Sequence, residues 1–187
     1  MNNTPHTNCL TLRLLHAAKG YKAVAFDIFD TLLKRDCARP ADLFALMEVT
    51  HQAALGFAEA RVAAEAETRQ TLGREVTLAE IYAHPALRGT DPAAECAAEL
   101  AMIAPNRPVA QAAAACHARG QKVYAVSDMY LPKEQIEAML QKCGLDFLDG
   151  VFVSCEYRVQ KRSGKLFKLF LQQTALRPAE VLLVGDS

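Results

Sequence analysis

The chain has no excess charge of either sign and no long apolar run. Of its 187 residues, 21 are lysine or arginine and 21 are aspartate or glutamate, so the formal net charge is zero. This balance gives no support to a nucleic-acid-binding role or to a polybasic membrane role. No apolar run approaches the roughly 18 residues that a membrane-spanning helix needs. We therefore expect neither a nucleic-acid partner nor a membrane.

Paired-cysteine motifs are also lacking. The six cysteines form no Cys-x-x-Cys pair, and Cys116 is directly followed by His117. This pattern indicates reduced thiols rather than a zinc site, and reduced thiols are typical of the cytosol. The N-terminal segment agrees, because Arg13 and His16 interrupt the apolar stretch that a secretory signal would need. The sequence predicts a cytoplasmic protein.

Short apolar runs flank an alanine-rich middle segment. Such runs between turn signals are typical of buried parallel strands, and helical segments separate the last three of them. We therefore predict an α/β fold, a Rossmann-like parallel sheet with helices on both faces. The four runs span residues 23–26, 123–126, 151–153 and 181–184.

The middle segment, residues 35–104, is predicted to be a helical insertion. Alanine is the strongest helix former and is concentrated here. Thr77 and Glu80 have the spacing of a capping box, and Asp91-Pro92 is a typical helix start. The predicted core therefore comprises residues 1–34 and 105–187, and a small helical bundle interrupts it.

Four polar features follow the predicted strands. Asp27 comes directly after the first, Ser127 ends the second, Lys161 precedes a helix, and Gly185-Asp186 follows the last. Ligands bind at the carboxyl ends of parallel strands, so these side chains should converge. The first three also have ordinary explanations: Asp27 with Asp30, or Ser127 with Asp128, would form a turn, and Lys161 would be solvated.

The order and placement of these residues resemble the haloacid dehalogenase-like (HAD) hydrolase superfamily. Its four motifs match Asp27 with Thr31-Leu32, then Ser127, Lys161 and Gly185-Asp186. The insertion lies where this family has its helical cap. The strings FDIFDTLL and SDMYLP further resemble a bacterial branch of the family. Some members of that branch are found beside or fused to polysaccharide glycosyltransferases, which implies a partner of this kind.

The resemblance implies a phosphatase that acts on a small phosphorylated metabolite. Asp27 would attack phosphorus to form an aspartyl-phosphate. Mg²⁺ would be held by Asp27, the backbone carbonyl of Phe29 and Asp186. Ser127 and Lys161 would bind the phosphoryl oxygens, with Asp128 and Thr31 as further substrate-binding residues. The cap would exclude water and shape the leaving-group pocket.

Two departures from the family pattern keep alternatives open. Phe29 stands where the family's phosphatases have a second aspartate as general acid and base, and Asp30 is a candidate replacement. An aromatic residue at this position also occurs in the metal-independent 2-haloacid dehalogenases. The chain ends at Ser187, before the further acidic residue of the fourth motif, which predicts a fragment or weakened metal binding. A dehalogenase and a catalytically weakened binding module of a polysaccharide-synthesis protein therefore remain as alternatives. The sequence decides neither the substrate nor the oligomeric state.

Overall fold

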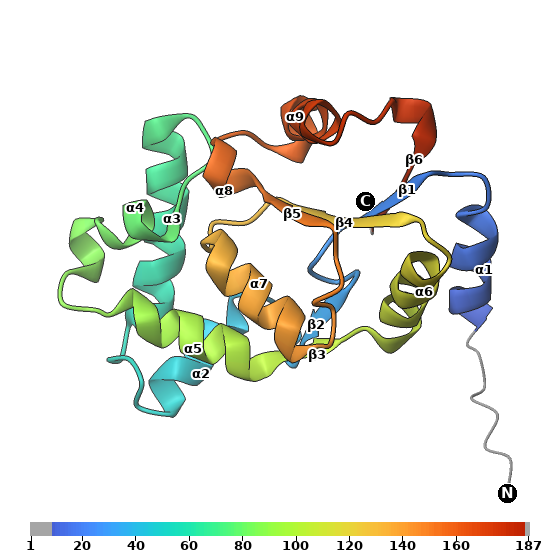
Figure 1. Ribbon diagram of the computed structural model, residues 1–187. Helices are drawn as coiled ribbons and strands as arrows, with labels where there is room; N and C mark the ends of the chain where they lie inside the picture. Colours follow the sequence, from blue (N-terminus) through green and yellow to red (C-terminus); the bar gives the residue numbers. More distant parts are fainter. Residues whose placement is uncertain (1–8, 186–187) are drawn as a thin grey trace, which may run out of the picture.

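A four-stranded parallel sheet lies at the centre of the protein (Figure 1). The computed structural model describes residues 9–185. The strand order is β5-β4-β1-β6, and each neighbouring pair is parallel. The strands contain the four apolar runs predicted from the sequence, and β4 and β5 extend beyond theirs by one or two residues. The strands are β1 (Ala23–Phe26), β4 (Lys122–Ser127), β5 (Gly150–Val153) and β6 (Val181–Val184).

Helices cover both faces of this sheet. Alternate residues of a strand point to opposite sides, and on β1 the residues of both sides are apolar and buried. Val24 and Phe26 belong to the apolar cluster that includes α6 (Arg107–Ala118) and α7 (Lys133–Lys142). Ala23 and Ala25 pack with α9 (Lys165–Thr174) on the other face. The predicted α/β architecture is thus confirmed. The remaining segments are α1 (Cys9–Ala17), which packs on α6, with α8 (Ser154–Tyr157), η2 (Lys161–Ser163) and η3 (Pro178–Glu180).

The alanine-rich segment is helical and lies beside the carboxyl ends of the strands (Figure 1). The predicted capping box is confirmed, since the Glu80 N–H donates to Thr77 Oγ1 and the Thr77 N–H donates to the Glu80 carboxylate. Asp91 likewise accepts from the Ala93 N–H at 2.9 Å. The residue limits 35 and 104 of the insertion stay a prediction. Its helices are α2 (Asp42–Val49), α3 (Phe57–Leu72), α4 (Leu78–Tyr82), η1 (Pro85–Leu87) and α5 (Pro92–Met102).

A short antiparallel ribbon connects the insertion to the rest of the chain. It consists of β2 (Leu33–Arg35) and β3 (Ile103–Pro105), with Arg35 opposite Ile103. The sequence does not predict this ribbon, because three residues are too few for a periodic pattern. Within residues 9–185, no helix combines the length and the apolar character that crossing a bilayer requires.

Candidate active site

Asp27 is held at the carboxyl end of the central strand β1. Its backbone N–H donates to the Val184 carbonyl at 2.8 Å, which extends the pairing of β1 with β6 by one residue. One carboxylate oxygen, Oδ1, accepts from the Ile28 N–H at 2.8 Å. The other, Oδ2, lies 2.6 Å from Nζ of Lys161. Backbone and ammonium donors therefore fix the orientation of a carboxylate that is mostly buried, with 14% of its side chain exposed.

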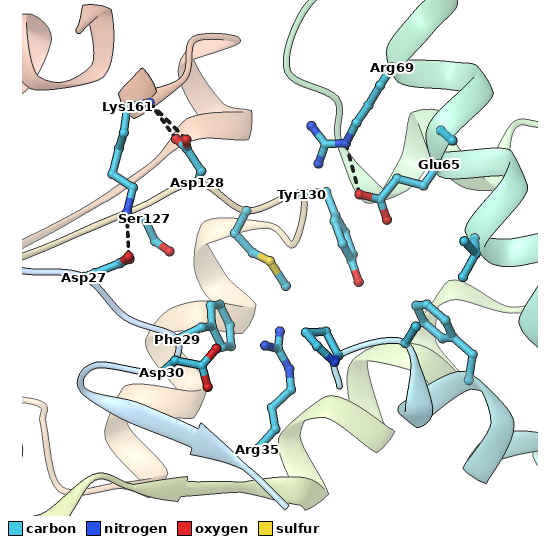
Figure 2. A pocket seen from close by; sticks show the side chains of 16 residues that line it. Asp27, Phe29, Asp30, Arg35, Glu65, Arg69, Ser127, Asp128, Tyr130 and Lys161 are labelled. Atoms are coloured by element: carbon cyan, nitrogen blue, oxygen red, sulfur yellow. Dashed lines mark hydrogen bonds and ion pairs between the residues drawn. The ribbon is translucent and has the colours of Figure 1, made fainter. Parts of the chain in front are cut away.

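Lys161 reaches Asp27 from a segment 134 residues further along the chain. It begins the short helix η2, and its backbone N–H donates to both carboxylate oxygens of Asp128, at 2.8 and 3.1 Å. Ser127, the buried last residue of β4, lies beside the Asp27–Lys161 pair (Figure 2). Asp27, Ser127 and Lys161 are thus brought together, as the strand-end argument predicts, and Asp128 lies with them.

These residues form one wall of a cavity of about 730 Å³ between the sheet and the helical insertion. Residues after β1, β4 and β5 contribute the charged floor, and α2 and α3 contribute the opposite wall (Figure 2). A cavity of this size accommodates a small metabolite. The lining consists of Asp27, Phe29, Asp30, Arg35, Pro40, Ala41, Phe44, Val62, Glu65, Ala66, Arg69, Ser127, Asp128, Met129, Tyr130 and Lys161.

Phe29 and Asp30 lie on the loop that follows Asp27. The guanidinium carbon of Arg35 lies 3.9 Å from the centroid of the Phe29 ring. Asp30 has a φ of 58°, a left-handed conformation that glycine adopts without strain and other residues rarely adopt. The exposed side chain of Asp30 lines the cavity and makes no hydrogen bond or ion pair within residues 9–185. It is therefore free to contact a ligand.

Two of the predicted site residues are not placed in the cavity wall. Thr31 is buried, with 5% exposure, and is not among the lining residues; its carbonyl accepts from the Asn106 side chain at 2.7 Å. Asp186 lies outside the described residues. The chain before it passes close to Asp27, since a Cβ built on Gly185 would lie 3.6 Å from Asp27 Cβ.

The described residues supply two of the three predicted magnesium ligands, since Asp186 lies outside them. Mg²⁺ requires about six oxygen ligands in octahedral geometry. Of the predicted ligands, the described residues supply the Asp27 carboxylate and the Phe29 carbonyl, and both Asp27 oxygens already accept hydrogen bonds. Residues 9–185 contain no group of three His, Cys, Asp or Glu side chains arranged for a metal. We therefore derive no chemical step through a metal.

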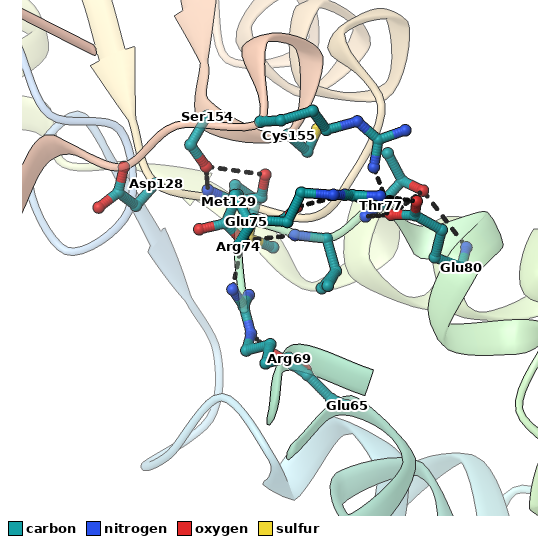
Figure 3. A network of polar contacts seen from close by, with 12 residues as sticks. Glu65, Arg69, Arg74, Glu75, Thr77, Glu80, Asp128, Met129, Ser154 and Cys155 are labelled. Atoms are coloured by element: carbon teal, nitrogen blue, oxygen red, sulfur yellow. Dashed lines mark hydrogen bonds and ion pairs between the residues drawn. The ribbon is translucent and has the colours of Figure 1, made fainter. Parts of the chain in front are cut away.

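A polar network attaches α4 to the sheet side of the cavity (Figure 3). The Leu78 N–H donates to the Tyr130 carbonyl at 2.8 Å. Glu80 accepts from Arg74 at 2.7 Å and also pairs with Arg158, which follows α8. The hydrogen bond from Arg74, aided by that from Arg158, lowers the pKa of Glu80 to about 2. These contacts fix the helical insertion over Asp27.

Sequence reasoning does not identify the residues that α3 contributes to the cavity. Arg69 reaches the cavity between two acidic partners, Glu65 at 3.0 Å and the buried Glu75 (Figure 3). The one sequence pattern that indicates them is their spacing, because residues three, four and seven positions apart lie on one face of a helix. That face consists of Val62, Glu65, Ala66 and Arg69.

Comparison with known families identifies the class of protein. The family of haloacid dehalogenase-like hydrolases matches residues 21–187. Because the match spans most of the chain, the protein belongs to this hydrolase family. No curated protein sequence matches it significantly.

Solved structures show the same fold at low sequence identity. The defluorinating L-2-haloacid dehalogenase Rha0230 is 23% identical, with a TM-score of 0.61 over 89% of this chain and 74% of that one. The L-2-haloacid dehalogenase of Xanthobacter autotrophicus with chloropropionic acid covalently bound is 22% identical, with a TM-score of 0.56 over 87% and 69%. A HAD family enzyme of Bacteroides thetaiotaomicron, in complex with magnesium and inorganic phosphate, is 15% identical, with a TM-score of 0.60 over 90% and 86%.

Proposed function

We propose that this hydrolase cleaves a small phosphorylated metabolite through a covalent intermediate on Asp27. The observation that carries the proposal is the Asp27 carboxylate, held 2.6 Å from the Lys161 ammonium at the floor of the cavity between the sheet and the helical insertion. A carboxylate held in this way is available for attack on phosphorus, and the adjacent cation offsets the charge of an incoming phosphate.

The proposed reaction has two steps. An Asp27 carboxylate oxygen attacks phosphorus, the bond to the leaving oxygen breaks, and that oxygen departs with the electron pair. Water then attacks phosphorus, releases phosphate and regenerates the carboxylate. Lys161 Nζ and the Ser127 hydroxyl donate to the non-bridging oxygens in both steps, which is consistent with their position beside Asp27 (Figure 2).

The ring of Phe29 cannot protonate a leaving group. General acid–base catalysis contributes roughly 10²–10⁴-fold in rate, so its loss affects poor leaving groups most. We therefore propose a preference for acyl or aryl phosphates over sugar phosphates. Asp30 is the candidate replacement, since its side chain lines the cavity without an ion-pair partner in the described part of the chain.

A requirement for Mg²⁺ is part of the proposal. Asp27, the Phe29 carbonyl and Asp186 are its proposed ligands, and the passage of Gly185 beside Asp27 supports the participation of the residue that follows. The ion would supply positive charge to the phosphoryl group.

Hydrolysis of a 2-haloacid is the second candidate, and the Phe29–Arg35 contact favours it. In that reaction Asp27 attacks the carbon that carries the halogen, halide leaves with the bonding electrons, and water cleaves the resulting ester. An apolar residue beside the nucleophile suits this chemistry, because halide needs no proton to leave. The solved dehalogenases of similar fold agree with this candidate.

Product release from a small substrate panel distinguishes the two candidates. The panel contains acetyl phosphate, 4-nitrophenyl phosphate, glucose 6-phosphate and 2-chloropropionate, each assayed with Mg²⁺ and with chelator. Mg²⁺-dependent phosphate release that is lost in Asp27→Asn and kept in Asp36→Asn, an exposed carboxylate outside the cavity, is the expected result. Chelator-resistant chloride release would establish the second candidate. Turnover that persists in Asp27→Asn would refute both.

A further inference from the structure

Arg35 differs from the other two cations that line the cavity, Lys161 and Arg69, in the hydrogen-bond donors that its side chain leaves unused. Lys161 is paired with Asp27, and Arg69 uses Nε and Nη1 to bind Glu65 and Glu75. Arg35 bonds Glu99 through Nε alone, at 2.8 and 3.2 Å to the two oxygens. Its two terminal amino groups make no hydrogen bond with any other described residue.

The guanidinium of Arg35 is nevertheless held in place. Glu99, on α5, is 1% exposed and binds it from behind, and the Phe29 ring supports its flat face at 3.9 Å. Burial raises the pKa of Glu99, and Arg35 opposes this rise. A buried carboxylate thus depends on Arg35, which makes it costly for the arginine to leave this position. Figure 2 shows the guanidinium of Arg35 pointing into the cavity that Asp27 lines.

An arginine fixed in this way is preorganised to bind an anion. Two parallel N–H donors match the two oxygens of a carboxylate, and the ordering entropy is already spent on contacts within the protein. Lys161 and Ser127 already lie beside Asp27 to meet the group that reacts (Figure 2). The terminal N–H donors of Arg35 are therefore available for a different group of the same substrate molecule.

We propose that Arg35 is a specificity-determining residue that binds a carboxylate of the substrate, so that the substrate is a small carboxylic acid whose reacting group lies at Asp27. With the function proposed above, on which the identity of the reacting group rests, this is a phosphorylated carboxylic acid. The carboxylate binding itself does not depend on that function, because a 2-haloacid has the same group.

Binding of non-hydrolysable compounds tests this without turnover. Calorimetry on the full chain measures the affinities of three compounds. 3-Phosphonopropionate carries both a phosphonate and a carboxylate, propylphosphonate carries the phosphonate alone, and butyrate carries the carboxylate alone. Because a hydrogen bond to a charged group contributes roughly 1.5–3 kcal/mol, 3-phosphonopropionate should bind about 10- to 100-fold more tightly than propylphosphonate. Butyrate should bind weakly and only when Arg35 is present.

Matched variants assign the effect to Arg35. Arg35→Lys keeps the charge that Glu99 needs but loses the two parallel N–H donors of the guanidinium. The ratio of the affinity for 3-phosphonopropionate to that for propylphosphonate should then come to within a few-fold of one. Arg39→Lys, at an exposed arginine outside the cavity that pairs with Asp42, should leave the ratio unchanged. Phe29→Leu removes the ring and should lower the ratio while Arg35 remains. A purely structural Arg35 would change stability and leave the ratio as it is.

The outcomes separate this inference from the proposed function. A wild-type ratio near one, or a ratio that Arg35→Lys and Phe29→Leu both leave intact, overturns the inference. If propylphosphonate and inorganic phosphate fail to bind while butyrate binds through Arg35, the phosphatase proposal is wrong and the carboxylate site stands.

Discussion

The centre of the helical insertion holds an ion pair that is fully removed from water. Arg61 on α3 and Glu95 on α5 both have 0% of their side chains exposed, and two hydrogen bonds of 2.7 and 2.9 Å join them. The hydroxyl of Tyr82 donates to Glu95 at 2.8 Å. The Arg61 guanidinium also lies 4.7 Å from the ring centroid of Tyr130 and 4.8 Å from that of Phe44, and both rings line the cavity.

Glu95→Gln tests what this pair contributes to folding. The change keeps the shape of the side chain but leaves the buried Arg61 with one charged partner, Glu65, at 3.1 Å. Removing one member of a buried pair typically costs roughly 3–5 kcal/mol, because the remaining charge is uncompensated. The amide oxygen still accepts one hydrogen bond, so we expect a loss near the lower end, about 3 kcal/mol. Glu65→Gln is the matched control, because that side chain is 25% exposed and its loss should cost less than about 1 kcal/mol.

Urea unfolding followed by circular dichroism measures both variants against the wild type. Two-state behaviour and equal m-values are needed for the comparison of unfolding free energies. A loss of about 3 kcal/mol is a large part of the roughly 5–15 kcal/mol that stabilises a typical domain. If Glu95→Gln costs no more than Glu65→Gln, the reasoning about uncompensated buried charge is wrong for this protein.

Three further predictions follow from the site and from the contacts of α4. Phe29→Asp should raise phosphate release from sugar phosphates by less than the roughly 10²–10⁴-fold that general acid catalysis contributes, because Arg35 would favour the ionised form of the new carboxyl group, with little gain for acetyl phosphate. Asp30→Asn should lower release from poor leaving groups and steepen the dependence of rate on leaving-group pKa; an unchanged rate and slope would exclude Asp30 as the acid. Because the pKa of Glu80 is lowered from 4.5 to about 2 in the folded state, its stabilising contribution is present above pH 4.5 and is lost as the pH falls toward 2. The free energy of unfolding of the wild type, measured in urea, should therefore fall toward that of Glu80→Gln across this range, by on the order of 1 kcal/mol after solvent screening.

Features that depend on neighbouring residues could be predicted from the sequence. The four central strands are short apolar runs between turn residues, and the Thr77–Glu80 capping box lies within four consecutive positions. The convergence of Asp27 and Lys161 is a contact over 134 residues, yet it too could be predicted. General rules of parallel sheets place the carboxyl ends of the strands at one edge, so the sequence had only to show which residues follow the strands.

The remaining part of the cavity depends on contacts that no local pattern encodes. Arg35 and Glu99 are 64 residues apart, and one lies on a three-residue strand that has no periodic signal. Glu65 and Arg69 are at ordinary spacing for an ion pair on an exposed helix face. Their position opposite Lys161 follows from how α3 packs against the other helices, which depends on long-range packing rather than on propensity.

Phe29 bears both on the proposed lack of a general acid and on the proposed role of Arg35. An aspartate at position 29 would bring a carboxylate next to the Arg35 guanidinium, now 3.9 Å from the ring centroid, and the two would pair. Such a pair would occupy the donors that we assign to the substrate. An aromatic ring instead supports the guanidinium through its face and leaves those donors free. In the function proposed above, the same phenylalanine thus accounts for the missing general acid and keeps Arg35 open to an anion. If this coupling holds, Phe29→Asp should reduce the preference for 3-phosphonopropionate over propylphosphonate in the same protein in which it speeds the cleavage of sugar phosphates.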